Sequence, residues 1–282
     1  MKTVKVKANG KLNLGLNITG REGEYHSLDT VMCAISIFDS VTVSTVKKPS
    51  PVTLKSSGYD LSDVSLSDNV VYKAARAFCD EFNLPGGSVS LRKIIPAGGG
   101  LGGSSSDIVA TVKAFQKAYE IEEDVLPLIK KLCSDGEFLY ENGIASVSRR
   151  GTVGKRFLLK EPLFFVVAVP EEKCVTAEIF KEFDRGDYPR KGCDEKNVLS
   201  SLINGDKPTE RELFNALYLP AKTLYGSVEE AYEHMRELSP DFFGMTGSGS
   251  CVYGCFSSPE LCRWAEDKLR RNVKEVFVCE SI

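Results

Sequence analysis

The residues that could do chemistry are concentrated between Ile95 and Asp107, where the chain reads IPAGGGLGGSSSD. Five of the six residues from Gly98 to Gly103 are glycines, and such a run weakens any helix or strand that contains it. Residues without side chains let successive backbone N–H groups converge on an anion, and a helix that begins directly afterwards adds the positive end of its dipole. The segment therefore predicts a phosphate-binding loop, with a flexible surface turn as the alternative.

Two common nucleotide-binding patterns fit this loop poorly. Gly98, Gly100 and Gly103 match G-x-G-x-x-G, but that dinucleotide fingerprint also needs an acidic residue at the end of a second strand about 20 residues later. The corresponding stretch here, AYEIEED, reads as the end of a helix and its exit turn. A Walker loop is excluded because no Gly-Lys-Ser or Gly-Lys-Thr closes the run.

A second group of polar residues lies near the start of the chain, in KLNLGLNITG (residues 11–20). Leucines and an isoleucine alternate there with polar residues and glycine, which predicts a strand with one buried and one polar face. Because side chains two positions apart share a face, Lys11 and Asn13 are expected to point the same way.

The composition limits the classes of partner. The 282 residues carry a formal net charge of −3, with 42% hydrophobic and 27% charged residues. This balance gives no electrostatic case for binding nucleic acid or an anionic membrane surface. The N-terminus lacks the apolar core of a signal peptide, and no apolar run approaches the length of a membrane span. We therefore expect a soluble cytoplasmic protein. Its expected partner is a small-molecule substrate, and the sequence leaves open whether it is a monomer or a homodimer.

Nine cysteines are present, without a C-x-x-C pair. The odd number and the apolar surroundings of several of them favour free buried thiols over disulfides or zinc ligands. We expect no metal site built from protein side chains.

The remaining sequence alternates between strand and helix patterns. Helices are predicted at 69–82, with Asp68 as N-cap, from Ser105 to Tyr119, at 125–133 and at 259–271. Strands are predicted at 41–46, 52–56, 88–94 and 162–170, with a further one in VKEVFVCES near the C-terminus, and 185–194 reads as a surface loop. A domain boundary is expected near Leu159, giving domains at 1–158 and 159–282.

Three motifs together resemble the GHMP kinases, the family of galactokinase, homoserine kinase, mevalonate kinase and phosphomevalonate kinase. They are PAGGGLGGSSSD, GKLNLGLNITGREGEYHSLDT near the start and GMTGSGSCVYGCF near the end. Within the family, Lys-Leu-Asn-Leu followed by Gly-Arg and Tyr-His, together with VTAEIF, looks most like the kinases of cytidine-diphosphate-linked sugar alcohols in the non-mevalonate isoprenoid pathway.

The resemblance implies an α+β, two-domain GHMP kinase fold, with an N-terminal domain like ribosomal protein S5 and a ferredoxin-like C-terminal domain. It implies ATP as phosphoryl donor and Mg²⁺ as its ion. The residues implied for nucleotide binding are Pro96, Gly98, Gly99, Gly100, Leu101, Gly102, Gly103, Ser104, Ser105 and Ser106. Thr246, Gly247 and Ser248 of the second glycine-rich turn are implied on the substrate side; taken alone, that turn reads as an ordinary hairpin.

The resemblance also implies a catalytic pair, Lys11 and Asp135. Lys11 matches by motif, and Asp135 matches by spacing. The family usually reads Gly-Ala-Asp-Val-Pro where this chain has Cys-Ser-Asp-Gly-Glu, and usually has Asn-Asp-Leu-Glu where it has FNALYLPA (214–221). Asp135 could otherwise simply end the preceding helix.

Substrate recognition is implied for Asn13, Tyr25, His26 and Phe180. Tyr can stack on a base and His can hydrogen-bond to its polar edge, and the resemblance assigns Tyr25 and His26 this role for cytosine with Phe180 as a second aromatic wall. An isolated Tyr-His is otherwise typical of a strand end.

Three functions remain open from the sequence. The first is a kinase of a cytidine-nucleotide-linked sugar alcohol. The second is another GHMP kinase of the homoserine or mevalonate type, whose acceptor carries no base. The third is a catalytically silent paralogue that binds nucleotide and regulates a partner, which the departures near Asp135 and at 214–221 keep open.

Overall fold

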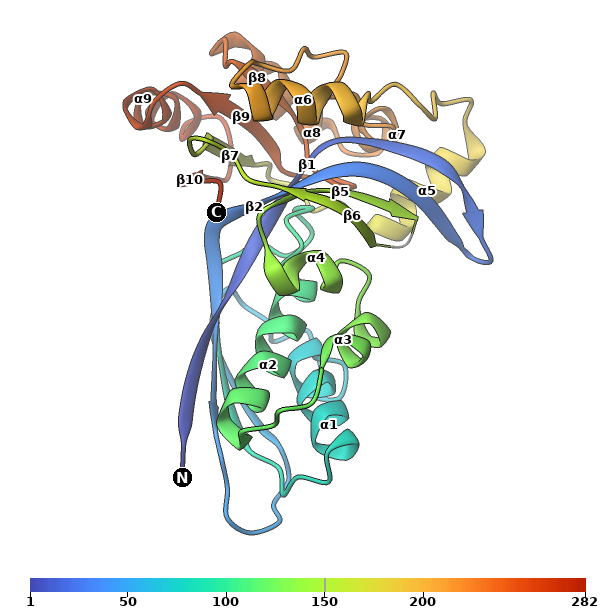
Figure 1. Ribbon diagram of the computed structural model, residues 1–282. Coiled ribbons are helices and arrows are strands. Elements are labelled where there is room, and N and C mark those ends of the chain that lie inside the picture. Colours follow the sequence, from blue (N-terminus) through green and yellow to red (C-terminus); the bar gives the residue numbers. More distant parts are fainter. Residues whose placement is uncertain (150) are drawn as a thin grey trace. The chain divides into compact units, whose positions relative to one another are not determined.

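The computed structural model describes residues 1–149 and 151–282 as a mixture of helices and strands (Figure 1). They form two compact units, each assembled from separate stretches of the chain. Unit 1 comprises residues 1–10, 37–96 and 102–141, and unit 2 comprises 11–36, 97–101 and 142–282. The long strands β1 (Thr3–Glu22) and β2 (Tyr25–Ser44) contribute residues to both units.

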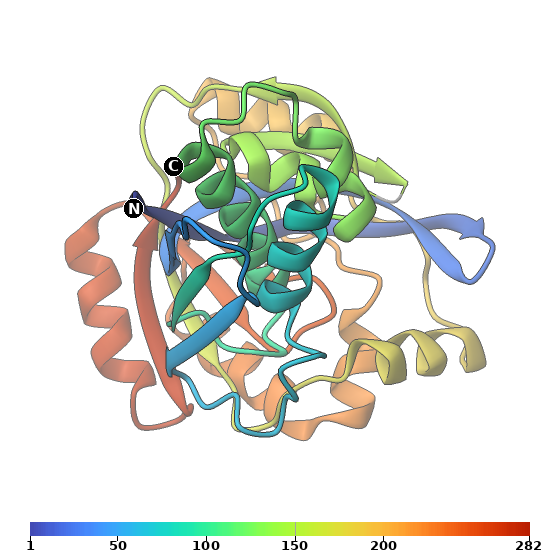
Figure 2. The same cartoon turned by 90° about the horizontal axis from the view of Figure 1, so that it is seen from below.

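Unit 1 packs four helices against a small set of strands. β4 (Ser88–Lys93) pairs antiparallel with the end of β2 and parallel with β3 (Thr53–Gly58). The helices lie together on one side of these strands (Figures 1 and 2). They are α1 (Val70–Glu81), α2 (Gly103–Tyr119), α3 (Leu126–Leu132) and α4 (Gly136–Glu141).

Unit 2 contains part of the six-stranded sheet to which β3, β4 and β2 also belong, and the whole of a four-stranded sheet. In the first, β5 (Ile144–Arg149) pairs antiparallel with the start of β2 and with β6 (Thr152–Phe157), while β1 pairs with β2. The second has the order β10-β7-β9-β8, every pair antiparallel. Its strands are β7 (Phe164–Val169), β8 (Phe242–Met245), β9 (Val252–Phe256) and β10 (Glu275–Glu280).

The second sheet of unit 2 confirms the expected ferredoxin-like order. Helices connect β7 to β8 and β9 to β10, and the chain-order numbers of the strands across the sheet run four, one, three, two. One apolar cluster joins α8 (Gly226–Glu237) and α9 (Pro259–Leu269) to the sheet. The other helices of this unit are α5 (Thr176–Arg185), α6 (Glu195–Asn204) and α7 (Tyr218–Leu224).

Several predicted elements are confirmed with shifted ends, and two details were wrong. The N-cap of α1 is Asn69, whose side chain accepts a hydrogen bond from the N–H of Val71, whereas Asp68 bonds to Ser65. Both faces of β1 are buried from Lys11 to Ile18, because the expected polar face is also covered by protein.

The predicted boundary near Leu159 lies inside unit 2, between β6 and β7. The division into domains at 1–158 and 159–282 stays a prediction. All nine cysteines are free thiols, and seven of them are buried. In the part of the chain that the structure describes, no helix is both long enough and apolar enough to cross a bilayer.

Candidate active site

The glycine loop has a regular backbone alternation. Gly98, Gly100 and Gly102 have φ values of +75°, +75° and +71°, a left-handed conformation that residues with side chains rarely adopt. Gly99 and Leu101, which lie between them, do not have positive φ values. An alternation of this kind turns consecutive N–H groups toward one side, which makes a concave anion-binding backbone.

The carbonyl groups of the loop are used by the rest of unit 2. Four consecutive carbonyls accept hydrogen bonds from the second glycine-rich turn and from β1, whereas the N–H groups of residues 98–105 enter no hydrogen bond within the described residues. The hydrogen bonds to its carbonyl groups hold the loop in place, and its N–H groups remain available to a ligand. The bonds are Ser250 N to Gly98 O at 3.0 Å, Cys251 N to Gly99 O at 3.2 Å, Thr246 Oγ1 to Gly100 O at 3.3 Å and Lys11 N to Leu101 O at 2.9 Å.

Close contact with the second turn explains why position 100 is glycine. A Cβ atom there would lie 2.1 Å from the carbonyl oxygen of Thr246 and 3.1 Å from that of Gly249. Both neighbours are backbone atoms, so a rotamer change could not relieve the clash. Any side chain at Gly100 must displace one glycine-rich segment from the other.

Asn215 holds the second turn from behind. Its amide nitrogen donates to the carbonyls of Met245 at 2.8 Å and Gly247 at 2.9 Å, and its Oδ1 accepts from the N–H of Leu217 at 2.9 Å. The sequence analysis treated 214–221 as a departure from the family pattern. The structure gives Asn215, which that pattern shares, a clear structural role.

Lys11 and Asn13 share one polar network on β1, as expected. The Lys11 ammonium donates to Oδ1 of Asn13, whose amide nitrogen donates to Thr30 Oγ1 at 3.0 Å. The Asn13 N–H donates to Thr246 Oγ1 at 2.9 Å. Lys11 and Asn13 are 5% and 2% exposed, so this network fixes both side chains. It also uses the hydroxyl of Thr246, which was assigned to substrate by the resemblance.

The start of α2 offers further N–H donors. Gly102 is the N-cap and provides no side-chain hydrogen bond, so the first N–H groups of the helix have no intrahelical acceptor. Ser104 is exposed and Ser105 is half-buried. Ser106 is buried and donates to the carbonyl of Asn9 at 2.5 Å, so its hydroxyl contacts protein rather than solvent. The helix begins at Gly103, two residues before the predicted start.

Asp135 lies directly before α4, where its carbonyl accepts a hydrogen bond from the N–H of Leu139 at 3.0 Å. The Cys133 thiol lies 3.8 Å from the carbonyl of Ser105, and burial together with the charge of Asp135 raises the pKa of this thiol to about 12. Asp135 is therefore near the first turn of α2. Gly136 is required by packing, since a Cβ there would lie 2.5 Å from Ile129 Cγ2.

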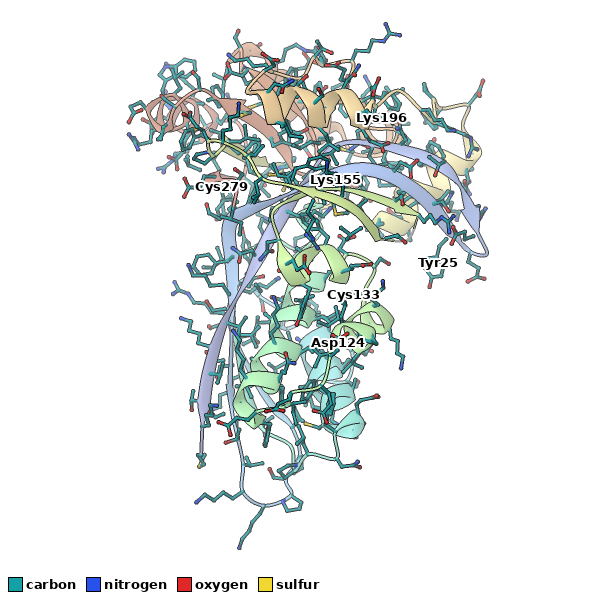
Figure 3. The ribbon with its side chains drawn as sticks, in the orientation of Figure 1. Tyr25, Asp124, Cys133, Lys155, Lys196 and Cys279 are labelled. Atoms are coloured by element: carbon teal, nitrogen blue, oxygen red, sulfur yellow. The ribbon has the colours of Figure 1, made fainter. Side chains whose placement is uncertain are left out.

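The aromatic residues predicted for base recognition are partly brought together. The rings of His26 and Phe180 stack with centroids 4.6 Å apart, and His26 Nε2 lies 2.8 Å from Oδ1 of Asp184. Asp184 and this stacking fix the imidazole, so one face of Phe180 is covered by His26. Tyr25 is 57% exposed at the start of β2 (Figure 3). Ser248 lies 3.0 Å, hydroxyl to hydroxyl, from Thr176 at the start of α5.

Sequence reasoning missed a buried charged group next to the loop. Lys93 contacts both Asp39 and Asp107 in unit 1. The signal was present, because Lys93 is the penultimate residue of the strand predicted at 88–94 and Asp107 closes the quoted motif.

Comparisons with known proteins identify the family of this chain. Residues 69–146 match the model of the GHMP kinases N terminal domain. The chain is 32% identical over 269 residues to 4-diphosphocytidyl-2-C-methyl-D-erythritol kinase of Thermus thermophilus, covering 93% of this chain and 91% of the relative. It is 28% identical to the kinase of that name in Prosthecochloris aestuarii, covering 100% of this chain and 99% of the relative.

Solved structures extend the likeness to the fold. A crystal structure of 4-(cytidine 5'-diphospho)-2C-methyl-D-erythritol kinase superposes with a TM-score of 0.81 at 28% identity, covering 99% of both chains. Homoserine kinase from Cytophaga hutchinsonii has a TM-score of 0.74 at 16% identity, covering 99% of this chain and 94% of its own, and supports the fold alone. The chain belongs to the GHMP kinase family, among the relatives of 4-diphosphocytidyl-2-C-methyl-D-erythritol kinase.

Proposed function

We propose that this protein transfers the γ-phosphoryl group of Mg²⁺-bound ATP to a hydroxyl of 4-diphosphocytidyl-2-C-methyl-D-erythritol, in non-mevalonate isoprenoid precursor biosynthesis. The observation that carries the proposal is the glycine loop, whose carbonyls accept hydrogen bonds from protein while the N–H groups of residues 98–105 donate none in the part of the chain that the structure describes. Donors of this kind bind phosphate groups at the start of a helix. The names of the relatives supply the acceptor.

In the proposed reaction, the loop and the first turn of α2 bind the β- and γ-phosphates of ATP. Asp135 accepts the proton of the acceptor hydroxyl as its oxygen attacks the γ-phosphorus. Lys11 stabilises the negative charge on that oxygen, and the bond from the γ-phosphorus to the bridging oxygen breaks to release ADP. Positioning and charge stabilisation supply most of the catalysis in such transfers.

Tyr25 and His26 bind the cytosine in this proposal. The exposed Tyr25 ring stacks on the base, and His26, oriented by Asp184 and Phe180, hydrogen-bonds to its polar edge. The other face of Phe180 serves as the second aromatic wall. An acceptor without a base, as in homoserine or mevalonate kinases, would need none of these contacts.

The decisive experiment measures ATP consumption with a panel of acceptors. Asp135→Asn and Lys11→Met should each lower kcat by roughly 10²–10⁴-fold, the usual scale for a positioned proton-transfer group, while the affinity for ATP changes much less. Asp124→Asn and Lys7→Met, at exposed positions, are the matched controls and should retain full turnover.

Three results would contradict the proposal. Unaltered turnover in Asp135→Asn would show that Asp135 is not the catalytic proton acceptor. Phosphorylation of free methylerythritol as efficiently as its cytidine conjugate would remove the base-binding assignment. A wild-type protein that binds ATP but turns over no acceptor would instead be the silent paralogue.

A further inference from the structure

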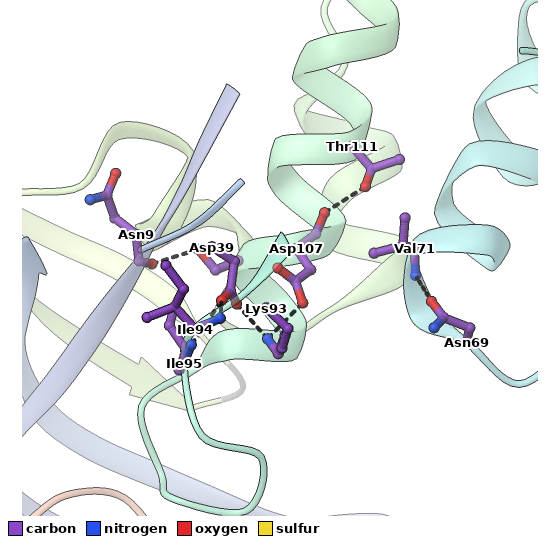
Figure 4. Close-up of polar contacts among 10 residues, drawn as sticks. Asn9, Asp39, Asn69, Val71, Lys93, Ile94, Ile95, Asp107 and Thr111 are labelled. Carbon is purple, nitrogen blue, oxygen red and sulfur yellow. Dashed lines mark hydrogen bonds and ion pairs between the residues drawn. The ribbon is translucent and has the colours of Figure 1, made fainter. Parts of the chain in front are cut away.

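Three charged side chains form a buried group in unit 1 (Figure 4). Lys93 Nζ donates to Asp39 Oδ2 at 2.5 Å and to Asp107 Oδ2 at 2.7 Å. The side chains of Asp39, Lys93 and Asp107 are 0%, 5% and 2% exposed. Two carboxylates and one ammonium leave one negative charge unbalanced when all three are ionised. An unbalanced buried charge is costly, so this group favours holding one proton more.

The two carboxylates differ in how well they are satisfied. Asp39 Oδ1 accepts hydrogen bonds from the N–H groups of Ile94 and Ile95, the latter at 2.8 Å. Oδ1 of Asp107 is buried and has no hydrogen-bond partner among the described residues. Burial raises the pKa of Asp107 to about 7, Lys93 opposes that rise and Asp39 adds to it. The extra proton therefore resides on Asp107.

The group lies directly beneath the first turn of α2. A Cβ atom on Gly103 would lie 2.9 Å from Lys93 Nζ and 2.9 Å from Ile95 Cγ2, so Lys93 contacts the backbone of the first residue of the helix. Asp107 is one turn further along α2. A negative charge here would oppose the phosphates that the N–H groups of this turn are proposed to bind.

Among the described residues, the other elements packed against α2 supply no second group of this kind. α1 contributes apolar residues and Cys79. Burial raises the pKa of the Cys79 thiol to about 11. On the side of α3 and α4, the groups that face α2 are Cys133, whose thiol has a raised pKa, and Asp135, which lies near Ser105. Lys113 of α2 itself bonds to the carbonyl of Tyr140 in α4, and from β1 the backbone carbonyl of Asn9 contacts Ser106.

We propose that Asp107 is a positioning residue for the nucleotide, acting through Lys93: its carboxyl carries a proton that keeps the group beneath Gly103 electrically neutral when the phosphates bind. The inference rests on the proposed function, because it assumes that the phosphates bind at this turn. By linkage, nucleotide binding strengthens proton binding at Asp107. The protein therefore takes up a proton from solvent as the nucleotide binds.

Calorimetric titration with Mg²⁺-bound AMPPNP in buffers of different ionisation heat measures this uptake. At pH 7 the wild type should take up roughly half a proton per nucleotide, since a group near its pKa is half-protonated. Its Kd should weaken up to about tenfold from pH 6 to pH 8. Asp107→Asn, which keeps the shape and stays neutral, should abolish the uptake and this pH dependence. The control, Asp124→Asn, should behave as wild type.

Nucleotide binding with equal proton uptake in wild type and Asp107→Asn would overturn the inference and leave the proposed function intact. Absence of AMPPNP binding to the wild type would overturn both. If Asp107→Asn does not fold, the wild type alone decides. Its uptake, corrected for the nucleotide's own protonation, must decline toward zero at pH 5.5, where Asp107 already carries its proton, and an undiminished uptake there would overturn the inference.

Discussion

The two glycine-rich segments of this protein use their backbones in opposite ways. In the loop at 98–102 the carbonyls accept hydrogen bonds from protein, and the N–H groups donate none within the described residues. In the turn at 246–250 the N–H groups of Thr246, Gly249 and Ser250 are donated to protein carbonyls. Both segments contain glycines, but the first leaves its N–H groups without a hydrogen bond among the described residues, whereas the second holds the first in position. The glycine-rich motifs alone therefore do not show which segment keeps its N–H groups available and which segment supports the other.

The supports of the two segments also differ. Behind the second turn stands Asn215, a neutral amide with three hydrogen bonds. Behind the start of α2 stand Lys93 and its two carboxylates. A neutral support is insensitive to pH near neutrality, whereas a charged one that shares a proton is not.

The largest effect should come from separating the two segments. Gly100→Ala places a Cβ atom against the Thr246 carbonyl and requires a left-handed φ, a strain of about 1–3 kcal/mol before the clash is counted. The affinity for ATP should fall by about 100-fold or more, the equivalent of roughly 2.7 kcal/mol. Fluorescence titration with an ATP analogue measures it. Gly226→Ala, where an added Cβ has no neighbour within 4 Å, should bind normally.

Removing the neutral support should have the next largest effect. Asn215→Ala leaves the carbonyls of Met245 and Gly247 without their donor, each at a cost of about 1–3 kcal/mol for a buried polar group. The free energy of unfolding should drop by about 2–5 kcal/mol in urea titrations, with kcat/KM reduced. Asn204→Ala at the exposed end of α6 is the control, and an equal loss there would remove the role of Asn215.

The charged support should make stability pH-dependent. The pKa of Asp107 is raised to about 7 by burial, so from about pH 4 to pH 7 the folded state binds more protons than the unfolded state. The contribution of Asp107 to the free energy of unfolding therefore falls as pH rises, by up to about 1.4 kcal/mol per pH unit. Subtracting the Asp107→Asn curve from the wild-type curve isolates this slope. A difference that is flat with pH, as expected for Asp124→Asn, would contradict the assignment.

The smallest effect should come from the exposed edge of the second turn. Ser248→Ala removes one half-exposed hydroxyl, and the KM of the acceptor should rise about threefold, the scale of one neutral hydrogen bond, with the KM of ATP unchanged. Thr176→Val removes the partner hydroxyl without altering the turn and should leave both constants unchanged. Equal effects of the two variants would mean that the hydroxyl pair, rather than Ser248 itself, is what matters.

Local patterns predicted the elements whose signal is local. The strand at 162–170 became β7, the helix at 125–133 became α3, and the alternation from Lys11 placed Lys11 and Asn13 in one network. Helices α4 to α7 were not predicted. The cap of α1 moved by one residue, because Asn69 and Asp68 are both good caps and the sequence alone does not rank them.

The sequence by itself determined the family, because three glycine-containing motifs occur in the order and at the spacing of the GHMP kinases. It also determined that the loop at 98–103 could bind an anion. Only the tertiary structure decided which glycine-rich segment holds the other and why position 100 must be glycine. It alone showed that Lys93, Asp39 and Asp107 meet, although 54 residues separate Asp39 from Lys93. These facts depend on contacts between residues that are distant in the chain, and no local sequence pattern shows which groups such contacts join.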